Sequence, residues 1–476
     1  MSKGPYSSDL YKNGLFIFRR DLRIEDNIGL LSTCKRCENL YCCFIFTPEQ
    51  ITSQNKYKSD PAVQFMMESL QELNISLSDK GGELLCFYGT NDKVLNDLVK
   101  QLNINCLFFN RDYTPYARER DSLIQKQCEK LGIGCELFDD YYLYPPGTVF
   151  NGSGTIYQKF KPFYEKVLPI KVFTTEKSRV RNLRKTSRKL DHRITLRDAI
   201  QRFSPSHAKD KQSQEASKMH GIIWKGGRSQ GLRQLMLART SQKQYEKTRD
   251  IFDINTSLLS AHLKFGTISV REVYWMFRGE FGKNSEILRQ LIWREFYAHI
   301  LYGKPGMINP RKNNPRGIKW NTNRRWFQLW CEGRTGFPIV DAAMRQLNQT
   351  GWMHNRGRLV VAIFLTKVLL IDWRWGEQYF ATKLVDYDIA SNNGNWQWVA
   401  STGADSMPYF RTMNPWTQAR EHDPECKYIK KWVPELNNVD NDIVLKWDEM
   451  WDSNIYLRPI VDFSKQRLKS LDLYKT

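Results

Sequence analysis

The sequence predicts an α/β protein with an N-terminal doubly wound parallel sheet (Rossmann-like) followed by a large all-helical domain. Three observations predict this. Short apolar runs alternate with helical patterns over the first 145 residues, the chain beyond residue 250 reads as almost wholly helical, and all fifteen tryptophans lie at or beyond Trp224. Alternating strands and helices are typical of a parallel sheet covered on both faces. Because 476 residues suggest two or three domains, we expect an α/β domain at 1–145, a basic interdomain linker or insert at 146–225 and a helical domain at 226–476.

The first domain is expected to contain five buried strands separated by helices. Helical spacing of apolar residues occurs at 62–73, 93–102 and 118–132. No GxGxxG follows the first strand and no Walker sequence occurs, so the ordinary nucleotide-binding signatures are missing. The short apolar runs that predict strands lie at 15–18, 40–46, 83–88, 106–109 and 135–138.

The connecting region is strongly basic. Residues 171–190 hold eight basic side chains and one acidic side chain. Such a run is typical of a solvated linker, but it also suits an extra patch that touches a phosphate backbone. Both interpretations stay open.

The whole chain is basic as well, since 72 lysines and arginines against 51 acidic residues give a net charge of +21. This excess favours a polyanionic partner, either nucleic acid or an anionic membrane surface. No apolar run approaches eighteen residues, and the start, MSKGPYSSDLYKNG, forms no apolar signal segment. We therefore expect a soluble intracellular protein whose ten cysteines are reduced thiols. Cys34 and Cys37 are spaced CxxC without a second pair or a nearby histidine, so we expect no metal site.

Polar and aromatic side chains share one face of the predicted helix 286–300. Gln290, Trp293, Arg294 and Tyr297 stand at i, i+3, i+4 and i+7. This face is poor core material because each polar head needs a partner. It suits a flat aromatic ligand beside a phosphate, and equally a satisfied face between domains.

The predicted helix 352–370 repeats this arrangement, with Asn355, Arg358 and Leu359 on one face. Arg358 lies in apolar sequence and therefore needs a carboxylate partner, for which Asp386 and Asp388 are the candidates. A structural ion pair is the simpler account, and it is compatible with a functional one.

The stretch SNNGNWQW, residues 391–398, follows these aspartates directly. Trp396 and Trp398 can stack on a flat ring, and the neighbouring amides can bond its edge, as bases and flavins require. Gly394 lets the backbone turn or approach a ligand closely. HExxH and GxSxG are absent from the sequence, so metal hydrolysis and acyl transfer have no support.

The sequence resembles the photolyase/cryptochrome family, and most of all its class I cyclobutane pyrimidine dimer photolyases. The similarity covers nearly the whole chain apart from roughly 171–225. It runs from FRRDLRIEDNIGL (18–30) through NRDYTPYARERD (110–121) to RPIVDFSKQRL near the end. It is densest in NTSLLSAHLKFGTISVRE (255–272), LIWREFY (291–297), GRTGFPIVDAAMRQLNQTGWMHNRGR (333–358) and DYDIASNNGNWQWVASTGADSMPYFR (386–411).

The resemblance implies an FAD in the helical domain, which in its reduced, photoexcited form passes an electron to a pyrimidine dimer flipped out of damaged DNA. Positions that match the family's FAD-binding residues are Tyr245, Thr256, Ser257, Leu258, Leu259, Ser260, Arg358, Asp386, Asp388 and Asn392. Positions that match its lesion- and DNA-binding residues are Arg249, Gln290, Trp293, Asn355, Arg356, Leu359, Trp398, Arg411 and Gln418. Among catalytic positions, Trp396, Trp373 and Trp320 match the chain that reduces an oxidised flavin, and Asn392 matches the residue facing flavin N5.

Two positions depart from the family's dimer photolyases. Gln290 stands where Glu is usual and lacks its charge, whereas Leu359 stands where Met is usual and roughly conserves its volume. Gln at this position is also found in (6-4) photolyases, but those carry His at the position of Asn355. Repair of (6-4) lesions and a cryptochrome-type blue-light photoreceptor therefore remain alternatives.

The resemblance leaves the identity of a second, antenna chromophore open. Ala117 falls where folate-binding relatives carry Glu, which disfavours folate and leaves a deazaflavin, a second flavin or none. We expect damaged DNA as the partner, no membrane and a monomer, with nothing in the sequence to distinguish nucleus from cytoplasm.

Overall fold

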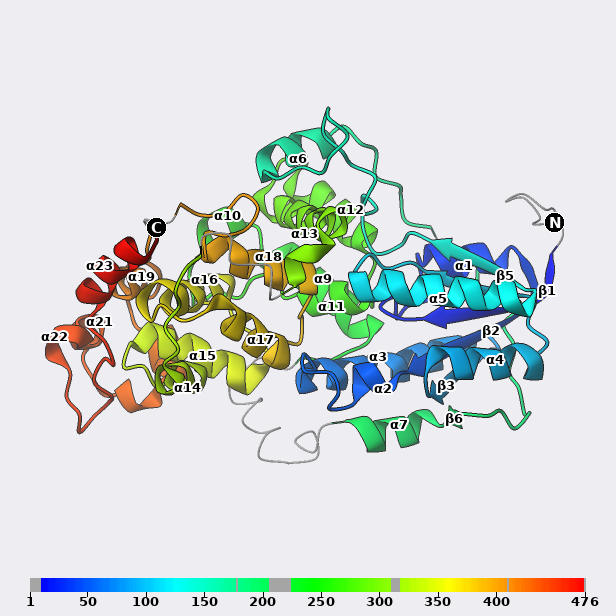
Figure 1. The fold of residues 1–476 in the computed structure, drawn as a ribbon, viewed down its shortest axis with the longest axis horizontal. Coiled ribbons are helices and arrows are strands. Elements are labelled where there is room, and N and C mark those ends of the chain that lie inside the picture. The colour runs from blue at the N-terminus through cyan, green and yellow to red at the C-terminus, as the bar shows by residue number, and fades with distance from the viewer. Residues whose placement is uncertain (1–9, 177–178, 205–223, 310–316, 409–410, 475–476) are drawn as a thin grey trace.

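The computed structural model describes residues 10–176, 179–204, 224–309, 317–408 and 411–474. A sheet covered by helices forms one end of the molecule and a larger group of helices forms the other (Figure 1). Strand β1 and helix α23 lie in these opposite parts (Figure 1). This arrangement confirms the predicted fold class.

The sheet of the described residues has six strands in the order β5-β4-β1-β2-β3-β6. All neighbouring strands are parallel except β6, which is antiparallel to β3. The five predicted strands are confirmed, whereas β6 was not predicted because two residues carry no periodic signal. The strands are β1 (Tyr11–Phe18), β2 (Cys37–Phe46), β3 (Leu84–Tyr88), β4 (Cys106–Asn110), β5 (Gly134–Phe138) and β6 (Arg193–Ile194).

Helices cover both faces of this sheet because successive strand side chains point to opposite sides. The helices of this part are α1 (Ile28–Cys34), α2 (Pro48–Ile51), α3 (Asp60–Asp79), α4 (Asn91–Gln101) and α5 (Pro115–Leu131). Phe16 and Phe18 of β1 pack in a core with α1 and α3, whereas Leu15 and Ile17 pack in a core with α4 and α5. The sheet is therefore doubly wound, as predicted.

The start of α5 is fixed by its own sequence. The Thr114 hydroxyl accepts a hydrogen bond from the backbone N–H of Ala117, and Pro115 occupies the first turn, where its missing N–H has no cost. The helix ends at Gly132, whose φ of +66° is the left-handed conformation that glycine tolerates. The first turn of α5 follows the carboxyl end of β4 and lines a cavity of the sheet domain.

The second part of the chain is helical, and no helix among the described ranges is long and apolar enough to cross a membrane. The predicted helix 286–300 is confirmed as α13. The predicted helix 352–370 starts later, at α16, and continues as the π-helix η3. The elements are α9 (Arg228–Ser241), α10 (Tyr245–Thr248), α11 (Ser260–Phe265), α12 (Val270–Phe281), α13 (Glu286–Gly303), η2 (Pro305–Ile308), α14 (Arg324–Glu332), α15 (Pro338–Thr350), α16 (Asn355–Ile363), η3 (Phe364–Val368), α17 (Trp373–Lys383), α18 (Ile389–Val399), α19 (Pro415–His422), α20 (Lys427–Trp432), η4 (Pro434–Leu436), α21 (Asn441–Leu445), α22 (Trp447–Met450) and α23 (Phe463–Tyr474).

Many tryptophans of this part fill its core. Trp330, Trp373, Trp432 and Trp447 are fully buried in one apolar cluster. Buried indoles need a hydrogen-bond acceptor, and the Nε1 of Trp330 donates to the carbonyl of Val361 at 3.0 Å. Packing therefore accounts for much of the tryptophan concentration noted in the sequence.

The connecting region contributes to both parts of the molecule. Its described residues form α6 (Phe160–Val167), β6 and α7 (Leu196–Phe203). Helix α6 lies beside α13, with which it shares a core (Figure 1). Helix α7 packs on the core that contains α3, and β6 extends the sheet. The described residues of this region, for which a linker or an insert was expected, thus contain helices and a short strand.

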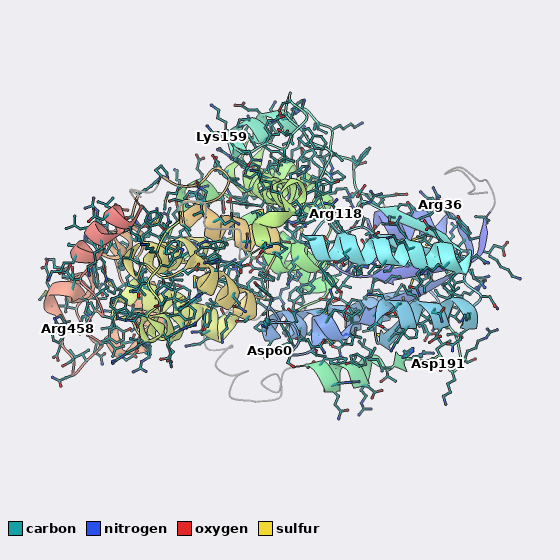
Figure 2. All side chains as sticks on the ribbon, viewed as in Figure 1. Arg36, Asp60, Arg118, Lys159, Asp191 and Arg458 are labelled. Atoms are coloured by element: carbon teal, nitrogen blue, oxygen red, sulfur yellow. The ribbon has the colours of Figure 1, made fainter. Side chains whose placement is uncertain are left out.

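A buried ion network joins the sheet to the helical part. Arg271 of α12 donates to Asp26 at 2.9 Å and to Asp140 at 2.8 Å. Arg118, at the start of α5, lies where the two parts meet (Figure 2), with its guanidinium 4.8 Å from the ring centre of Tyr302 of α13. These contacts hold the loop after β1, the segment after β5 and the start of α5 against the helical domain.

Candidate functional site

Two adjoining cavities lie where the loop after β1 reaches the helical domain. The larger cavity, about 250 Å³, is lined by residues of α11, α12 and α13, and the smaller cavity, about 120 Å³, by residues of α16, α17 and α18. Arg358, Asp386, Asp388 and Ser391 line both cavities. The cavities are therefore two parts of one site, with both aspartates at their junction.

Asp386 is the carboxylate partner that Arg358 required. Arg358 Nη2 donates to Asp386 Oδ2 at 2.8 Å, and Ser260 Oγ donates to the same oxygen at 2.7 Å. The Asp386 side chain is 4% exposed, and its Oδ1 is buried without a hydrogen-bond partner among the described residues. Because a buried carboxylate oxygen needs a donor, this atom is suited to accept an N–H or O–H group of a ligand.

Asp388 is bound by an arginine that the sequence analysis missed. Arg20 Nη2 donates to Asp388 at 3.1 Å, and the backbone N–H of Ser391 donates to it at 3.1 Å. Burial alone would raise the pKa of Asp388, but Arg20 and the bond from Ser391 hold this pKa below its usual value. One signal was available, since Arg20 follows β1 and ligands of parallel sheets bind at the carboxyl ends of strands.

Asn392 is oriented by a buried glutamate that the sequence analysis also missed. Asn392 Nδ2 donates to both the carbonyl and Oε1 of Glu377, each at 3.0 Å. Burial raises the pKa of Glu377 to about 7, despite opposing hydrogen bonds from Asn392 and Asn393. With its amide nitrogen directed to Glu377, Asn392 keeps its Oδ1 as an acceptor beside the smaller cavity.

Basic side chains outnumber acidic ones around the larger cavity. Burial, followed by the positive charge of Arg20, lowers the pKa of Lys264 to about 8, so this lysine remains mostly charged at neutral pH. An enclosed excess of cations favours an anionic group such as a diphosphate. The charged residues lining this cavity are Arg20, Lys264, Arg294 and Arg358 against Asp386 and Asp388.

The residues expected at the FAD phosphates are only partly gathered here. Tyr245, Ser257, Leu259 and Ser260 line the larger cavity, whereas Thr256 and Leu258 are not among its lining residues. The run turns sharply at Leu258, whose φ is +51°. A free acceptor at Asp386, a cationic wall and hydroxyl groups are the features that an FAD requires of its site, so the residues present fit this cofactor.

The residues expected at the lesion divide between the cavities and their surroundings. Asn355 and Leu359 line the smaller cavity and Gln290 lines the larger one. Trp293 and Trp398 are half-buried and line neither of these two cavities.

The expected DNA contacts lie at the edge of this region, mostly beside acidic neighbours. Arg249 donates to a glutamate of α13 at 2.9 Å, and Arg356 donates to Asp250 at 2.7 Å. Gln418 is buried and accepts from Arg356 at 3.5 Å. Arg411 is exposed. Since Arg249 and Arg356 are already paired, a phosphate would have to compete with these carboxylates.

The three expected electron-chain tryptophans differ in burial. Trp396 is buried and lines the smaller cavity, and Trp373 is buried in α17. Trp320 is half-buried, with its ring edge-on to Tyr474 at 6.0 Å. Trp330, which the sequence analysis did not single out, lies edge-on to Trp396 with ring centres 6.2 Å apart.

A third cavity of about 480 Å³, the sheet-domain cavity, lies at the carboxyl ends of β1 and β2 and beside the first turn of α5. Arg20 and Lys264 line both this cavity and the larger cavity, while Tyr387 lines both it and the smaller cavity. The sheet-domain cavity therefore shares side chains with the rest of the site. Sequence reasoning did not locate it because its lining comes from many separate segments.

Known proteins resemble this chain in both sequence and fold. Family profiles match residues 15–182 as DNA photolyase and residues 287–476 as the FAD binding domain of DNA photolyase. The deoxyribodipyrimidine photo-lyase of Escherichia coli is 36% identical over 96% of this chain and 97% of its own.

Solved structures agree with these matches. An archaeal photolyase from Sulfolobus tokodaii, solved with two FAD molecules, is 39% identical and superposes with a TM-score of 0.84, covering 97% of this chain and 99% of its own. A Synechocystis cryptochrome is 27% identical, with a TM-score of 0.86 over 98% of this chain and 100% of its own. Near-complete coverage at such identity, together with the cavities described above, shows that this chain belongs to the DNA photolyase family.

Proposed function

We propose that this protein is a deoxyribodipyrimidine photo-lyase, which repairs cyclobutane pyrimidine dimers in DNA in a light-driven, FAD-dependent reaction. The observation that carries the proposal is the pair of adjoining cavities, one rich in cations and the other lined by Asn392, Asn355 and Leu359. The larger, cation-rich cavity suits a dinucleotide. The smaller cavity places amide groups and the apolar side chain of Leu359 next to it. The similarity to relatives named deoxyribodipyrimidine photo-lyase supports the same conclusion.

The residues of the larger cavity would hold FAD, whose chemistry when bound is to supply the electron that light drives onto the lesion. Arg20 and Lys264 would neutralise the diphosphate, and Ser257 and Ser260 would supply hydroxyl groups near it. Asp386 Oδ1 would accept a ligand N–H or O–H, since Arg358 and Ser260 already occupy its other oxygen. Fixed donors and acceptors of this kind need no rearrangement during the reaction.

The remaining expected residues would bind the lesion and its DNA. Trp293 and Trp398 would stack on the flipped dimer, with Gln290, Asn355 and Leu359 against its edges; Arg249, Arg356, Arg411 and Gln418 would contact the strand around it. One electron enters the dimer, two carbon–carbon bonds of its cyclobutane ring break, and the electron returns. No external oxidant or reductant is consumed in a turnover. Trp396, Trp373 and Trp320 would carry electrons inward when the flavin is oxidised.

We further propose that the sheet-domain cavity holds a second, light-harvesting chromophore. At about 480 Å³ it has the largest volume of the three cavities. It shares Arg20 and Lys264 with the larger of the other two cavities and Tyr387 with the smaller. The Sulfolobus tokodaii relative was solved with two FAD molecules. Extraction of the purified protein and chromatography of the released pigments would distinguish a second flavin from a deazaflavin or from none.

We propose the corresponding division of the chain, with an antenna-type domain at 1–145, a connecting segment at 146–225 and an FAD- and DNA-binding domain at 226–476. We also propose that the protein acts inside the cell as a monomer, without a membrane, wherever the DNA lies. Light scattering of the purified protein tests the monomer, because a mass of twice 56.2 kDa would show a dimer.

The decisive experiment mixes pre-reduced protein with an oligonucleotide that carries one cyclobutane thymine dimer, and separately with one that carries a (6-4) lesion. Each mixture is exposed to blue light beside a dark control. We expect light-dependent loss of the cyclobutane dimer alone. Repair of the (6-4) lesion instead would show that this lesion is the substrate, and would make Gln290 the residue to test for this specificity. If flavin-loaded protein repaired neither lesion, a photoreceptor function would be favoured, since the chain also resembles a Synechocystis cryptochrome in fold.

A further inference from the structure

Phe160, the first residue of α6, contacts the lesion-wall candidate Trp293 face to face. The two ring centres are 3.6 Å apart and the ring planes differ by 4°. Helix α6 belongs to the segment that connects the two domains and lies beside α13 (Figure 1), and Lys159, which precedes α6, lies at the outer edge of the molecule (Figure 2). A residue of the connecting segment therefore covers one face of the Trp293 indole.

The surroundings hold the two rings in this geometry. Free aromatic pairs prefer offset or edge-to-face contacts at ring-centre distances of about 4.5–7 Å, so a closer parallel overlap needs support from neighbours. Phe296 supplies it, because its ring stands edge-on to Phe160 (5.7 Å, 83°) and to Trp293 (5.7 Å, 84°).

Phe160 itself is held on the remaining sides. It is 2% exposed, and its backbone N–H donates to Asp405 Oδ2 at 3.3 Å. The guanidinium of Arg289 lies 5.4 Å from its ring centre. Asp405 belongs to the loop that follows α18, the helix that carries Trp398. Phe160 is thus in contact with the segments that carry both expected walls of the lesion pocket.

Phe160 lies nearer to the Trp293 indole than the rings of Phe296 and Tyr297 do. Trp293 is half-buried, and its further ring neighbour, Tyr297, lies at the larger centre distance of 5.8 Å with planes inclined by 29°. An indole must keep its plane parallel to a base to stack on it, so the orientation of Trp293 determines how well it can receive a lesion.

We infer that Phe160 is a positioning residue for lesion recognition, which sets the plane of the Trp293 indole on which the flipped dimer stacks. This inference rests on the proposed function, in which Trp293 contacts the lesion. It assigns part of the specificity for damaged DNA to the connecting segment, which carries no other residue of the proposed site.

The test compares Phe160→Leu, which is apolar but not flat, with Phe160→Tyr, which keeps the flat face. Dissociation constants are measured in the dark on the flavin-loaded full chain, for a duplex with one cyclobutane thymine dimer and for the same duplex undamaged. Since an aromatic pair contributes about 2- to 10-fold in an equilibrium constant, we expect Phe160→Leu to lose about that factor for the damaged duplex only. Phe160→Tyr should retain wild-type affinity for both.

A double-mutant cycle with Trp293→Ala separates positioning from general packing. If Phe160 acts through the indole, Phe160→Leu should cause no further loss once the indole is absent, because coupled residues are not additive. Equal loss for damaged and undamaged duplex, or additive loss in the double variant, would overturn the inference. Phe160→Met, similar in size and also not flat, gives the same comparison where leucine lowers the yield of folded protein.

The outcomes also separate this inference from the function on which it rests. Wild-type protein that binds damaged and undamaged duplex equally would refute the proposed repair function. Loss of discrimination in Trp293→Ala but not in Phe160→Leu or Phe160→Met would leave the function intact and refute the role of Phe160 alone.

Discussion

Replacing Glu377 with glutamine is expected to stabilise the protein increasingly as the pH rises from 5 to 8. Glu377 is 4% exposed, and burial raises its pKa from 4.5 to about 7. A carboxyl group whose pKa is raised by folding contributes stability that is fully present below pH 4.5 and is lost as the pH rises through 7. Glutamine resembles the protonated acid in shape and still offers Oε1 to Asn392, so the variant should not lose this stability.

The size of the effect follows from the shift in pKa. A shift from 4.5 to about 7 corresponds to about 3 kcal/mol, at 1.36 kcal/mol for each pH unit. About 2.5 kcal/mol of this falls between pH 5 and pH 8, because pH 5 already lies above the unfolded pKa. For a domain of roughly 250 residues, such as the helical domain that contains Glu377, 1 kcal/mol changes the Tm by about 2 °C. The difference in Tm between Glu377→Gln and the wild type should therefore grow by about 5 °C over this range.

The assay is thermal unfolding followed by circular dichroism at several pH values, for the wild type, Glu377→Gln and a control, Glu332→Gln. Glu332 is a surface residue at the end of α14 that pairs with Arg334 at 3.5 Å. Burial also raises the pKa of Glu295 to about 7, but this group is common to all three proteins and cancels in the differences. A Tm difference for Glu377→Gln that stays constant across this range, as for the control, would show that Glu377 does not titrate with a raised pKa.

Three further outcomes are expected. Asp386→Asn should weaken flavin binding by about 1–3 kcal/mol, because it replaces the charged carboxylate whose free Oδ1 is proposed to accept from the ligand; an unchanged ratio of flavin to protein absorbance would contradict this. Trp320→Phe should slow photoreduction of the oxidised flavin while repair by chemically reduced protein continues, and unaltered photoreduction would point to another route, for which Trp330 beside Trp396 is the first candidate. Affinity for undamaged duplex should fall linearly with salt on logarithmic axes, since a basic surface displaces counterions; a flat response would exclude phosphate contacts as its source.

Much of the fold could be predicted because it depends on local periodicity. Buried strands of a parallel sheet are continuous apolar runs, and five of them were visible without any knowledge of their partners. Strand β6 could not be found this way, since Arg193–Ile194 is too short for a pattern and pairs only because the chain returns to the edge of the sheet. The same return places part of the basic connecting region at the edge of the sheet.

The candidate site was predictable only where one residue demanded another. Arg358 in an apolar helix needed a carboxylate, and Asp386 supplies it. Nothing comparable pointed to Arg20, which donates to Asp388 from 368 residues away in the sequence. Nothing pointed to Glu377 either, because its hydrogen bond with Asn392 forms only when α17 packs against α18.

The two-part architecture, the helix faces that carry polar and aromatic groups and, through the resemblance, the family could all be inferred from the amino-acid sequence. These follow from spacing and residue type, which are properties of short segments. Three features became visible only in the folded protein: which groups share a cavity, which carboxylate oxygen lacks a donor, and that Phe160 covers Trp293. Such contacts depend on how distant segments pack, and burial, which sets both pKa values and unsatisfied hydrogen bonds, exists only once they have packed.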